Sequence, residues 1–323
     1  MNSIPIIFRE RQVARTVVGG KRNLNPERLN ISVILLNKRG GHLQIQTYEK
    51  LLACQFSSIV SVEPDNENYN IEEISKRFPQ IKFVIPLEHA TDGELINCCM
   101  DEVDSEYVLV LRDNMRIPSG LILQNLAQRL ISSKVFCVVP SMIDQEGQSV
   151  LINYIPSAER GRFVIKSDEA IQDGLETLLP FDFVGLYNKE RFIQLGGFDW
   201  TIKSSFWQYA DLSLRAWLWG EKIHITTLFQ IQYKEDVEIP DMTADLSYLR
   251  FYLKNILPKF KADHGVMPVY LFLVFLRNCS CGIFEAWKQF SQAAKWVKVN
   301  KFRFCQDVQE LIENWGAKNV KKQ

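Results

Sequence analysis

The chain has 323 residues, of which 46% are hydrophobic and 24% charged, with 38 basic and 38 acidic side chains. This composition is typical of a globular protein with one large domain or two small ones. Zero net charge argues against a whole-protein nucleic-acid binder, which usually carries a basic excess, so no nucleic-acid partner is expected. The balance is uneven, because residues 1–30 hold six basic and two acidic side chains, and residues 288–323 hold eight and three.

Seven cysteines occur without the spacing of a metal or redox motif. Cys98-Cys99 and Cys279-Ser280-Cys281 have no second pair or histidine cluster that would complete a zinc site. We expect reduced, mostly buried thiols, which indicates a reducing compartment such as the cytoplasm. The N-terminus has no long apolar run, so no signal peptide is expected.

The longest apolar stretch, residues 268–276, is half of the roughly 18 residues that a membrane-spanning helix needs. It predicts either a core helix or an interfacial helix. Together with the basic C-terminal end, it indicates peripheral contact with the inner face of a membrane through the C-terminal region. Packing of this segment onto the rest of the protein is the alternative.

Strand and helix patterns alternate from residue 31 to residue 143. Continuous apolar, β-rich runs predict strands, and apolar spacing of three and four residues predicts the helices between them. This order indicates right-handed βαβ units in a largely parallel sheet, which binds ligands at the carboxyl ends of its strands. The predicted strands are 31–36, 57–64, 81–87, 106–111 and 135–143, and the predicted helices are 44–55, 70–79, 92–103 and 120–133.

The pattern changes after residue 140. We expect a hairpin turn at 144–148, a strand and a short helix within 179–200, an amphipathic helix at 208–222 and a late strand at 223–233. After Pro240 the sequence predicts helices, with a polar break near 261–265. We therefore divide the chain into a poorly packed N-terminal arm (1–29), an α/β domain (30–239) and a C-terminal helical region (240–323).

Two motifs in the second half resemble a known family. The run Gly196–Asp199 (Gly-Gly-Phe-Asp), followed by Asp211-Leu212, Arg215 and Gly220, resembles the acceptor-side half of family 2 glycosyltransferases, which have the GT-A fold. The aromatic and basic stretch 248–255 is similar to the helix that follows in many members. The resemblance spans about residues 30–255. It implies a Rossmann-like, mostly parallel sheet, a nucleotide-diphosphate sugar donor, and a glycan, lipid-linked or protein acceptor.

The family's metal motif, Leu-Asp-any-Asp, aligns with Leu111–Asn114. Arg112 and Asn114 replace the two expected carboxylates, and Asp113 takes the middle position. Three alternatives stay open: Asp113 ligates Mn or Mg after a shift of the turn, Arg112 itself neutralises phosphate, or the site has lost its function. No cofactor is therefore firmly expected.

The resemblance also implies contacts to the nucleotide-sugar. Glu63 follows the second strand, where the family usually has an aspartate that binds the base, and its alternative role is a solvated loop acid. Asn97 lies on the helix before the metal-binding strand, where the family often has asparagine, and it can equally be an ordinary exposed residue. The full predicted set for the nucleotide-sugar is Asn37, Arg39, Glu63, Asn97, Arg112, Asp113 and Asn114.

The family's catalytic-base motif aligns with Gln208–Asp211. Tyr209 stands at the base position, and a tyrosine with an ordinary pKa near 10 is a poor base at neutral pH. Asp211 and Asp199 are the remaining carboxylates that the resemblance offers as a base. For the acceptor it implies Gly197, Phe198 and Trp207, with Trp207 predicted in a loop where its ring could stack on a sugar.

These replacements leave two main functions open. The first is an active, metal-independent glycosyltransferase. The second is a catalytically inactive GT-A-fold module that binds a ligand or assembles with a partner in glycan biosynthesis. A nucleotidyltransferase, which shares the sheet pattern, is a third and weaker alternative. The chain lacks the glycine-rich first loop with arginine or lysine that is expected of that class, but Lys38-Arg39-Gly40-Gly41 keeps this alternative open.

Overall fold

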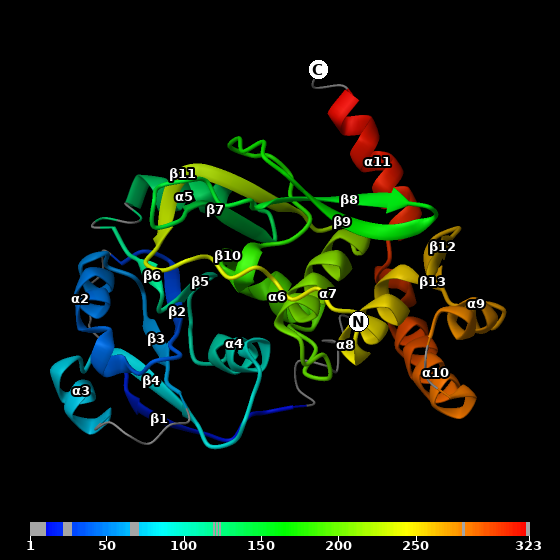
Figure 1. The fold of residues 1–323 in the computed structure, drawn as a ribbon. Coiled ribbons are helices and arrows are strands. Elements are labelled where there is room, and N and C mark those ends of the chain that lie inside the picture. The colour runs from blue at the N-terminus through cyan, green and yellow to red at the C-terminus, as the bar shows by residue number, and fades with distance from the viewer. Residues whose placement is uncertain are drawn as a thin grey trace.

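The computed structural model describes residues 11–21, 28–64, 71–118, 120, 122, 124–279 and 282–320, with side chains left out at 278 and 316–320. A mixed sheet of nine strands, in the order β1–β4–β3–β2–β5–β10–β7–β11–β6, forms its centre (Figure 1). Its strands are β1 Arg15–Gly19, β2 Ile31–Leu36, β3 Ile59–Val62, β4 Ile81–Pro86, β5 Tyr107–Arg112, β6 Met115–Arg116, β7 Cys137–Ile143, β10 Gly185–Asn188 and β11 Ile223–Tyr233.

Helices flank this sheet and continue into the C-terminal region (Figure 1). Two small two-stranded sheets, β8 Asn153–Glu159 with β9 Arg162–Asp168 and β12 Lys259–Lys261 with β13 His264–Val266, lie outside it. The helical elements are η1 Gly41–Leu43, α2 Ile45–Ala53, α3 Ile71–Arg77, α4 Asp92–Met100, α5 Gln124–Ser132, η2 Phe181–Phe183, α6 Lys189–Leu195, α7 Ser205–Leu218, α8 Leu246–Phe251, η3 Tyr252–Ile256, α9 Leu271–Asn278, α10 Ile283–Asn300, η4 Lys301–Arg303 and α11 Val308–Val320.

The parallel half of the sheet confirms the predicted α/β class. β2 pairs in parallel with β3 and β5, and β3 pairs in parallel with β4. Every residue of β2 and β5 is buried, as expected for apolar strands covered on both faces. The carboxyl ends of β2, β3, β4 and β5 therefore meet at one edge, where the polar residues that follow these strands come together.

The N-terminal arm differs from its prediction. Residues 15–19 form β1, which pairs antiparallel with β4 as the edge strand of the large sheet. Arg11 bonds Glu88 and Glu94, and Arg15 bonds Glu102. The absence of clear periodicity predicted a poorly packed arm, which is wrong for this segment, because ladder hydrogen bonds and ion pairs need no apolar pattern. Residues 1–10 and 22–27 of the arm lie outside the described residues.

The glycine pair after α6 supplies a backbone shape. Gly196 ends α6 with φ of 92°, and Gly197 follows with φ of 66°. Both values are left-handed, and glycine adopts them without the steric cost of a Cβ atom. The guanidinium of Arg215 is fully buried in α7, and it donates hydrogen bonds to the carbonyls of Leu195 and Gly197. The turn is thereby fixed against α7.

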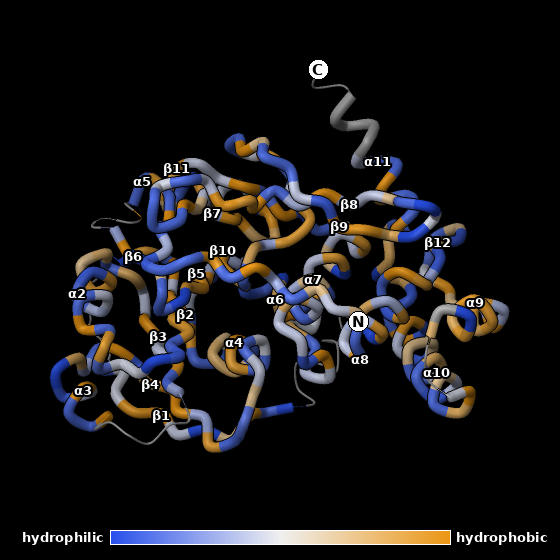
Figure 2. The backbone as a smooth tube through the Cα atoms, viewed as in Figure 1, coloured by the Kyte–Doolittle hydropathy of each residue, from blue (hydrophilic) through white to orange (hydrophobic). Residues whose placement is uncertain are grey.

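The C-terminal region has its own small core. Buried side chains from η3, α9 and α10 pack together, and η3 is a single π-helical turn. The polar break predicted near 261–265 is the β12–β13 hairpin, an element that the expectation of helices alone missed. Among the helices of the described segments, none combines the length and the apolar character that crossing a membrane requires. Figure 2 shows apolar residues concentrated on the central strands and on α9.

We predict that Gly185→Ala destabilises the join between the two halves of the sheet. Gly185 lies in β10, which pairs antiparallel with β5 and β7, and an added Cβ would lie 2.6 Å from Cys137 Sγ. Such overpacking costs about 1–3 kcal/mol in free energy of unfolding, measured by urea denaturation. Adding Cys137→Ala removes the clashing sulfur, so the double variant should lose less than the sum of the two single variants.

Gly282→Ala is the matched control for this cycle. Its added Cβ meets nothing within 4 Å, so only the lower preference of a helix N-cap for alanine should reduce its free energy of unfolding, by about 0.5–1 kcal/mol and independently of Cys137. Equal losses at positions 185 and 282, or strict additivity with Cys137→Ala, would show that contact with the sulfur is not the cause.

Candidate functional site

Two cavities adjoin at the carboxyl edge of the parallel strands. The larger has a volume of about 690 Å³, the smaller about 190 Å³, and Lys38 and Asp92 line both. The larger cavity is bounded by the turns after β2 and β5, the start of α4, η2, the start of α7 and the segment 233–245. From the predicted nucleotide-sugar set, Arg39, Arg112, Asp113 and Asn114 line the larger cavity, and Asn37 and Glu63 the smaller.

Glu63 is the buried anchor of the smaller cavity. Its side chain accepts hydrogen bonds from the Gly41 amide at 2.8 Å and from the Ser61 hydroxyl at 2.7 Å. These bonds fix the turn that follows β2. Asn37 lies beside it, and the Asn37 Oδ1 atom is buried without a hydrogen-bond partner in the described part of the chain. A ligand N–H placed in this cavity would satisfy that acceptor.

Arg112 is the central cation of the larger cavity. It ends β5 and is 3% exposed, and its Nη2 atom lies 2.8 Å from Asp92 and 2.6 Å from Asp182. Burial opposes its charge, but the carboxylates of Asp182 and Asp92 outweigh this and raise the pKa of Arg112 above its ordinary value. The Nη1 atom is buried and has no hydrogen-bond partner among the described residues. One donor of the guanidinium therefore remains for a ligand.

The partner Asp182 is held in an unfavourable backbone conformation. Asp182 and Phe183 have φ of 50° and 64°, the left-handed region that non-glycine residues seldom occupy. Burial raises the pKa of Asp182 above its ordinary value, although the Arg112 guanidinium opposes this effect. The Arg112 guanidinium also lies over the Phe183 ring, 5.5 Å from its centroid. Backbone strain of this kind clusters at ligand sites.

Asp113 turns away from a ligand role in this structure. Its Oδ2 atom accepts hydrogen bonds from the Lys38 and Arg39 amides, both at 3.2 Å, and from Arg39 Nε at 3.3 Å. Asp92 and Asp182 are both paired with Arg112. Within the described segments, no three histidine, cysteine, aspartate or glutamate side chains form a group that could hold a metal ion. The three carboxylates at this strand end, Asp92, Asp113 and Asp182, are therefore already engaged by protein groups.

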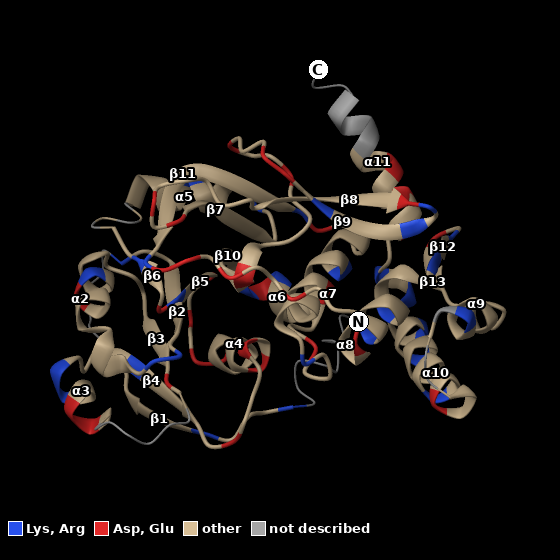
Figure 3. Cartoon of the chain, in the orientation of Figure 1, with Lys and Arg blue, Asp and Glu red and all other residues tan. Residues whose placement is uncertain are grey.

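The charges in the larger cavity are separated. Its basic residues come mainly from the turns after β2 and β5, whereas four of its seven carboxylates lie on the segment after β11, which Figure 3 shows in red. Glu235 of this segment pairs with Arg39. Lys38 is exposed, and within the described chain its ammonium group has no hydrogen bond or ion pair. Because Lys38 lines both cavities, its positive charge lies where they meet.

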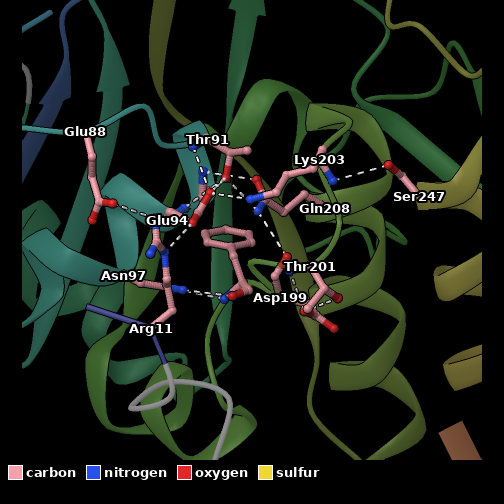
Figure 4. Close-up of polar contacts among 12 residues, drawn as sticks. Arg11, Glu88, Thr91, Glu94, Asn97, Asp199, Thr201, Lys203, Gln208 and Ser247 are labelled. Carbon is pink, nitrogen blue, oxygen red and sulfur yellow. Dashed lines mark hydrogen bonds and ion pairs between the residues drawn. The ribbon is translucent and has the colours of Figure 1, made fainter. Parts of the chain in front are cut away.

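A polar network joins α4 to α7 (Figure 4). The Gln208 amide donates to Thr91 Oγ1 at 2.9 Å and to the Asp199 carbonyl at 3.2 Å, and it accepts from the Gly93 amide at 3.1 Å. Glu94 closes a capping box with Thr91 and pairs with Lys203. Gln208, at the acidic position of the family motif, therefore positions the start of α4, from which Asp92 reaches Arg112.

Asn97 binds protein backbone. Its side chain donates to the Phe198 carbonyl at 2.8 Å and accepts from the Phe198 amide at 2.9 Å. Phe198 is buried against Phe183 and Phe192, and the Gly197 carbonyl accepts from Arg215. These three residues of the predicted nucleotide and acceptor sets lie outside the lining of the two cavities described above.

The two predicted base carboxylates, Asp199 and Asp211, are brought together by Lys254. Lys254 Nζ lies 2.6 Å from Asp199 Oδ2 and 3.0 Å from Asp211 Oδ1, and Asp211 also pairs with Arg215 at 2.8 Å. Burial alone would raise the pKa of Asp199, but Lys254 outweighs it and holds that pKa well below the usual range. Two cations and two carboxylates thus balance in a buried cluster behind the cavity.

Tyr209 lines the larger cavity, but it is 2% exposed, and burial raises its pKa well above the ordinary value of 10. It is therefore neutral at physiological pH and can donate a hydrogen bond. Trp207 lies in the first turn of α7, although it was predicted in a loop. It is buried, its indole N–H donates to the Thr243 carbonyl, and its ring packs against Phe206 and Phe251.

Sequence reasoning missed Asp92, Asp182 and Lys254. Asp92 stands in the first turn of α4, where a carboxylate is common because it complements the helix dipole. Asp182 lies in an irregular segment with no motif. Lys254 lies in the aromatic and basic stretch 248–255, but the sequence did not indicate that its ion-pair partners would be Asp199 and Asp211. The pairing partners lie 20 to 70 residues away along the chain and left no local signal.

Comparison with known proteins gives structural matches only, since no family model and no curated sequence matches this chain. The structure titled GalNAc-T7 with UDP, GalNAc and Mn2+ has a TM-score of 0.57 and 14% identity, over 94% of this chain and 61% of that one. The mannosyltransferase PcManGT from Pyrobaculum calidifontis, in complex with GDP-Man and Mn2+, has a TM-score of 0.48 and 11% identity, over 91% and 79%. S. aureus TarS 1-349 in complex with UDP-GlcNAc has a TM-score of 0.48 and 14% identity, over 82% and 72%.

The match to GalNAc-T7 shows a GT-A-type fold, which confirms the expected architecture. The chain spans about three fifths of the length of that protein. At this level of identity the likeness concerns the fold alone.

We predict that Lys254→Met destabilises the protein by about 3–5 kcal/mol in free energy of unfolding, because it leaves two buried carboxylates with too little positive charge. Denaturant unfolding measures this loss. Lys295→Met, on the exposed side of α10, is the control and should stay within about 0.5 kcal/mol of the wild type. A small loss for Lys254→Met would mean that the cluster is not a structural ion-pair network.

Proposed function

We propose that this chain is a glycosyltransferase-like protein that binds a nucleotide-diphosphate sugar across the two adjoining cavities. The smaller cavity would take the base and the larger one the diphosphate and sugar. In the active form of this proposal, the sugar is transferred to a glycan, lipid-linked or protein acceptor that enters beside the start of α7.

The observation that carries the proposal is a set of buried polar atoms without partners at the cavities. Asn37 Oδ1, Arg112 Nη1 and Asn114 Oδ1 are buried and lack a hydrogen bond within the described chain. Such atoms cost free energy unless a ligand or water satisfies them. All three follow the carboxyl ends of β2 and β5, where sheets of this kind bind ligands. The fold match to GalNAc-T7, whose crystal structure contains UDP, GalNAc and Mn2+, supports a nucleotide-sugar as the class of ligand.

Different residues at the two cavities suit different parts of the nucleotide-sugar. Asn37 offers an acceptor to the N–H of a base, and Glu63 keeps the surrounding turn in place. Lys38 lies where the two cavities meet and Arg39 lines the larger one, so both would place positive charge near a diphosphate. Arg112 contributes one hydrogen-bond donor, but its charge is already matched by Asp92 and Asp182. Lys38 is therefore the main cation left for phosphate.

A second function, binding without transfer, is favoured by the state of the predicted bases. Asp199 and Asp211 are held by Lys254 and Arg215 outside the lining of the two cavities described above, and Tyr209 stays protonated. A general base must accept a proton within hydrogen-bond reach of the acceptor hydroxyl. On this second proposal the donor site is kept as a ligand-binding site of an assembly module. An assay of sugar transfer to glycan, lipid-linked and protein acceptors distinguishes the active transferase from the binding module.

We predict that UDP-sugars or other nucleotide-sugars raise the melting temperature of the purified protein equally with manganese and with a chelator. The reason is that the carboxylates near Arg112 are already engaged and the cavity offers cationic side chains instead. A panel of nucleotides and nucleotide-sugars measured by thermal shift provides the test. No shift with any nucleotide would reject the donor site, and a shift that requires manganese would assign a ligand role to Asp113.

We predict that Lys38→Ala weakens nucleotide-sugar binding by roughly tenfold or more, because a hydrogen bond to a charged phosphate is lost. The melting temperature without ligand should not change, since Lys38 is exposed. Lys76→Ala, an exposed lysine on α3, removes the same charge far from the cavities and serves as the control. Equal affinities for the two variants in isothermal titration would contradict the placement of the diphosphate.

A further inference from the structure

One end of the C-terminal region carries large apolar side chains on its surface. We name it the α9–α10 apolar surface, formed by Val269, Tyr270, Leu273, Ile283, Phe284 and Trp287. All six are exposed, with Phe284 at 90% and Leu273 at 62%. Large apolar patches of this kind mark contact sites for proteins or membranes.

Contact between α9 and α10 brings these two groups of exposed side chains to the same end of the C-terminal region. Hydrogen bonds from the Phe272 and Leu273 amides to the Val269 and Tyr270 carbonyls extend the helical turn backwards from α9. Val269, Tyr270 and Leu273 therefore lie on one side of that helix, at spacings of three and four residues. Ile283, Phe284 and Trp287 have the same spacing in α10, and the Trp287 ring meets Phe272 of α9 at a centroid distance of 4.9 Å.

α9 is apolar on both of its sides. Leu271 and Phe275 are buried in the C-terminal core, whereas Leu273 points outward. A helix that is apolar all round is normally buried in a core or in lipid. The eight residues of α9 are too few to cross a bilayer, so an interfacial position is the remaining membrane placement.

The charge around this surface identifies the kind of partner. Residues 256–304 contain eight basic and two acidic side chains, and Figure 3 shows basic residues on β12, α9 and α10. Arg277 and Lys288, both exposed, lie on the same two helices as the apolar residues. Two copies of a segment this basic would repel each other, whereas a negatively charged lipid surface attracts it. Tyrosine and tryptophan also favour the boundary between lipid and water.

We propose that the α9–α10 apolar surface docks this protein onto an anionic lipid bilayer. Leu273, Phe284 and Trp287 enter the boundary between headgroups and acyl chains, and the surrounding lysine and arginine side chains contact the headgroups. The proposal is independent of the nucleotide-sugar site, because no residue of this surface lines the two cavities described above.

Sedimentation with vesicles tests the proposal. The full chain should co-sediment with vesicles of phosphatidylcholine and phosphatidylserine, and much less with phosphatidylcholine alone. Leu273→Ser combined with Phe284→Ser should weaken binding by at least about tenfold, because two apolar side chains no longer enter the lipid. Arg277→Glu should weaken binding to the anionic vesicles by about fivefold or more, with little effect on neutral ones.

Leu87→Ser is the matched control, because Leu87 is similarly exposed, at 65%, but follows β4 away from this surface. It should bind vesicles like the wild type. Circular dichroism and unchanged melting temperatures establish that the variants are folded. Failure of the wild type to bind either vesicle, or equal binding by the double serine variant, would overturn the proposal. So would a wild-type dimer in light scattering that the double variant abolishes, since it would assign the surface to self-association.

Discussion

The pairing of one buried guanidinium with two carboxylates determines the arrangement of the whole site. Arg112 ends a central strand, Asp92 begins α4, and Asp182 lies in the strained turn before β10. Removing a charge of this kind from water is favourable only when partners and geometry compensate. The three elements must therefore stay in register, and the cavity that they bound takes its shape from this contact. Burial of its carboxylate is the main reason why Asp182 is harder to ionise than an ordinary aspartate.

Several residues of the predicted sites, and of the segments beside them, bind other parts of the protein. Gln208 binds the start of α4, Asn97 binds the backbone of Phe198, and Lys254 holds Asp199 and Asp211 together. Each of these contacts satisfies buried polar groups that would otherwise destabilise the fold. In this structure these side chains therefore stabilise the fold. This is why the fold supports a donor site more strongly than it supports any one catalytic base.

The two proposals concern different ends of the molecule and rest on different physics. The donor site depends on buried unpartnered polar atoms and on cations placed at the carboxyl ends of strands. The proposal for the α9–α10 apolar surface depends on exposed apolar side chains in a segment with an excess of basic residues. If both hold, a sugar donor from solution and an acceptor associated with a membrane could meet on one protein. That combination would suit a lipid-linked acceptor among the three classes proposed.

The sequence alone determined the α/β class, the order of the central strands and helices, and the edge where polar residues gather, because buried strands and amphipathic helices leave periodic apolar patterns. Only the tertiary structure decided that Arg112 binds Asp92 and Asp182, that Trp207 is buried, and that residues 15–19 extend the sheet. Ion pairs and edge-strand hydrogen bonds join residues far apart along the chain, and no local pattern records which distant partner each will meet.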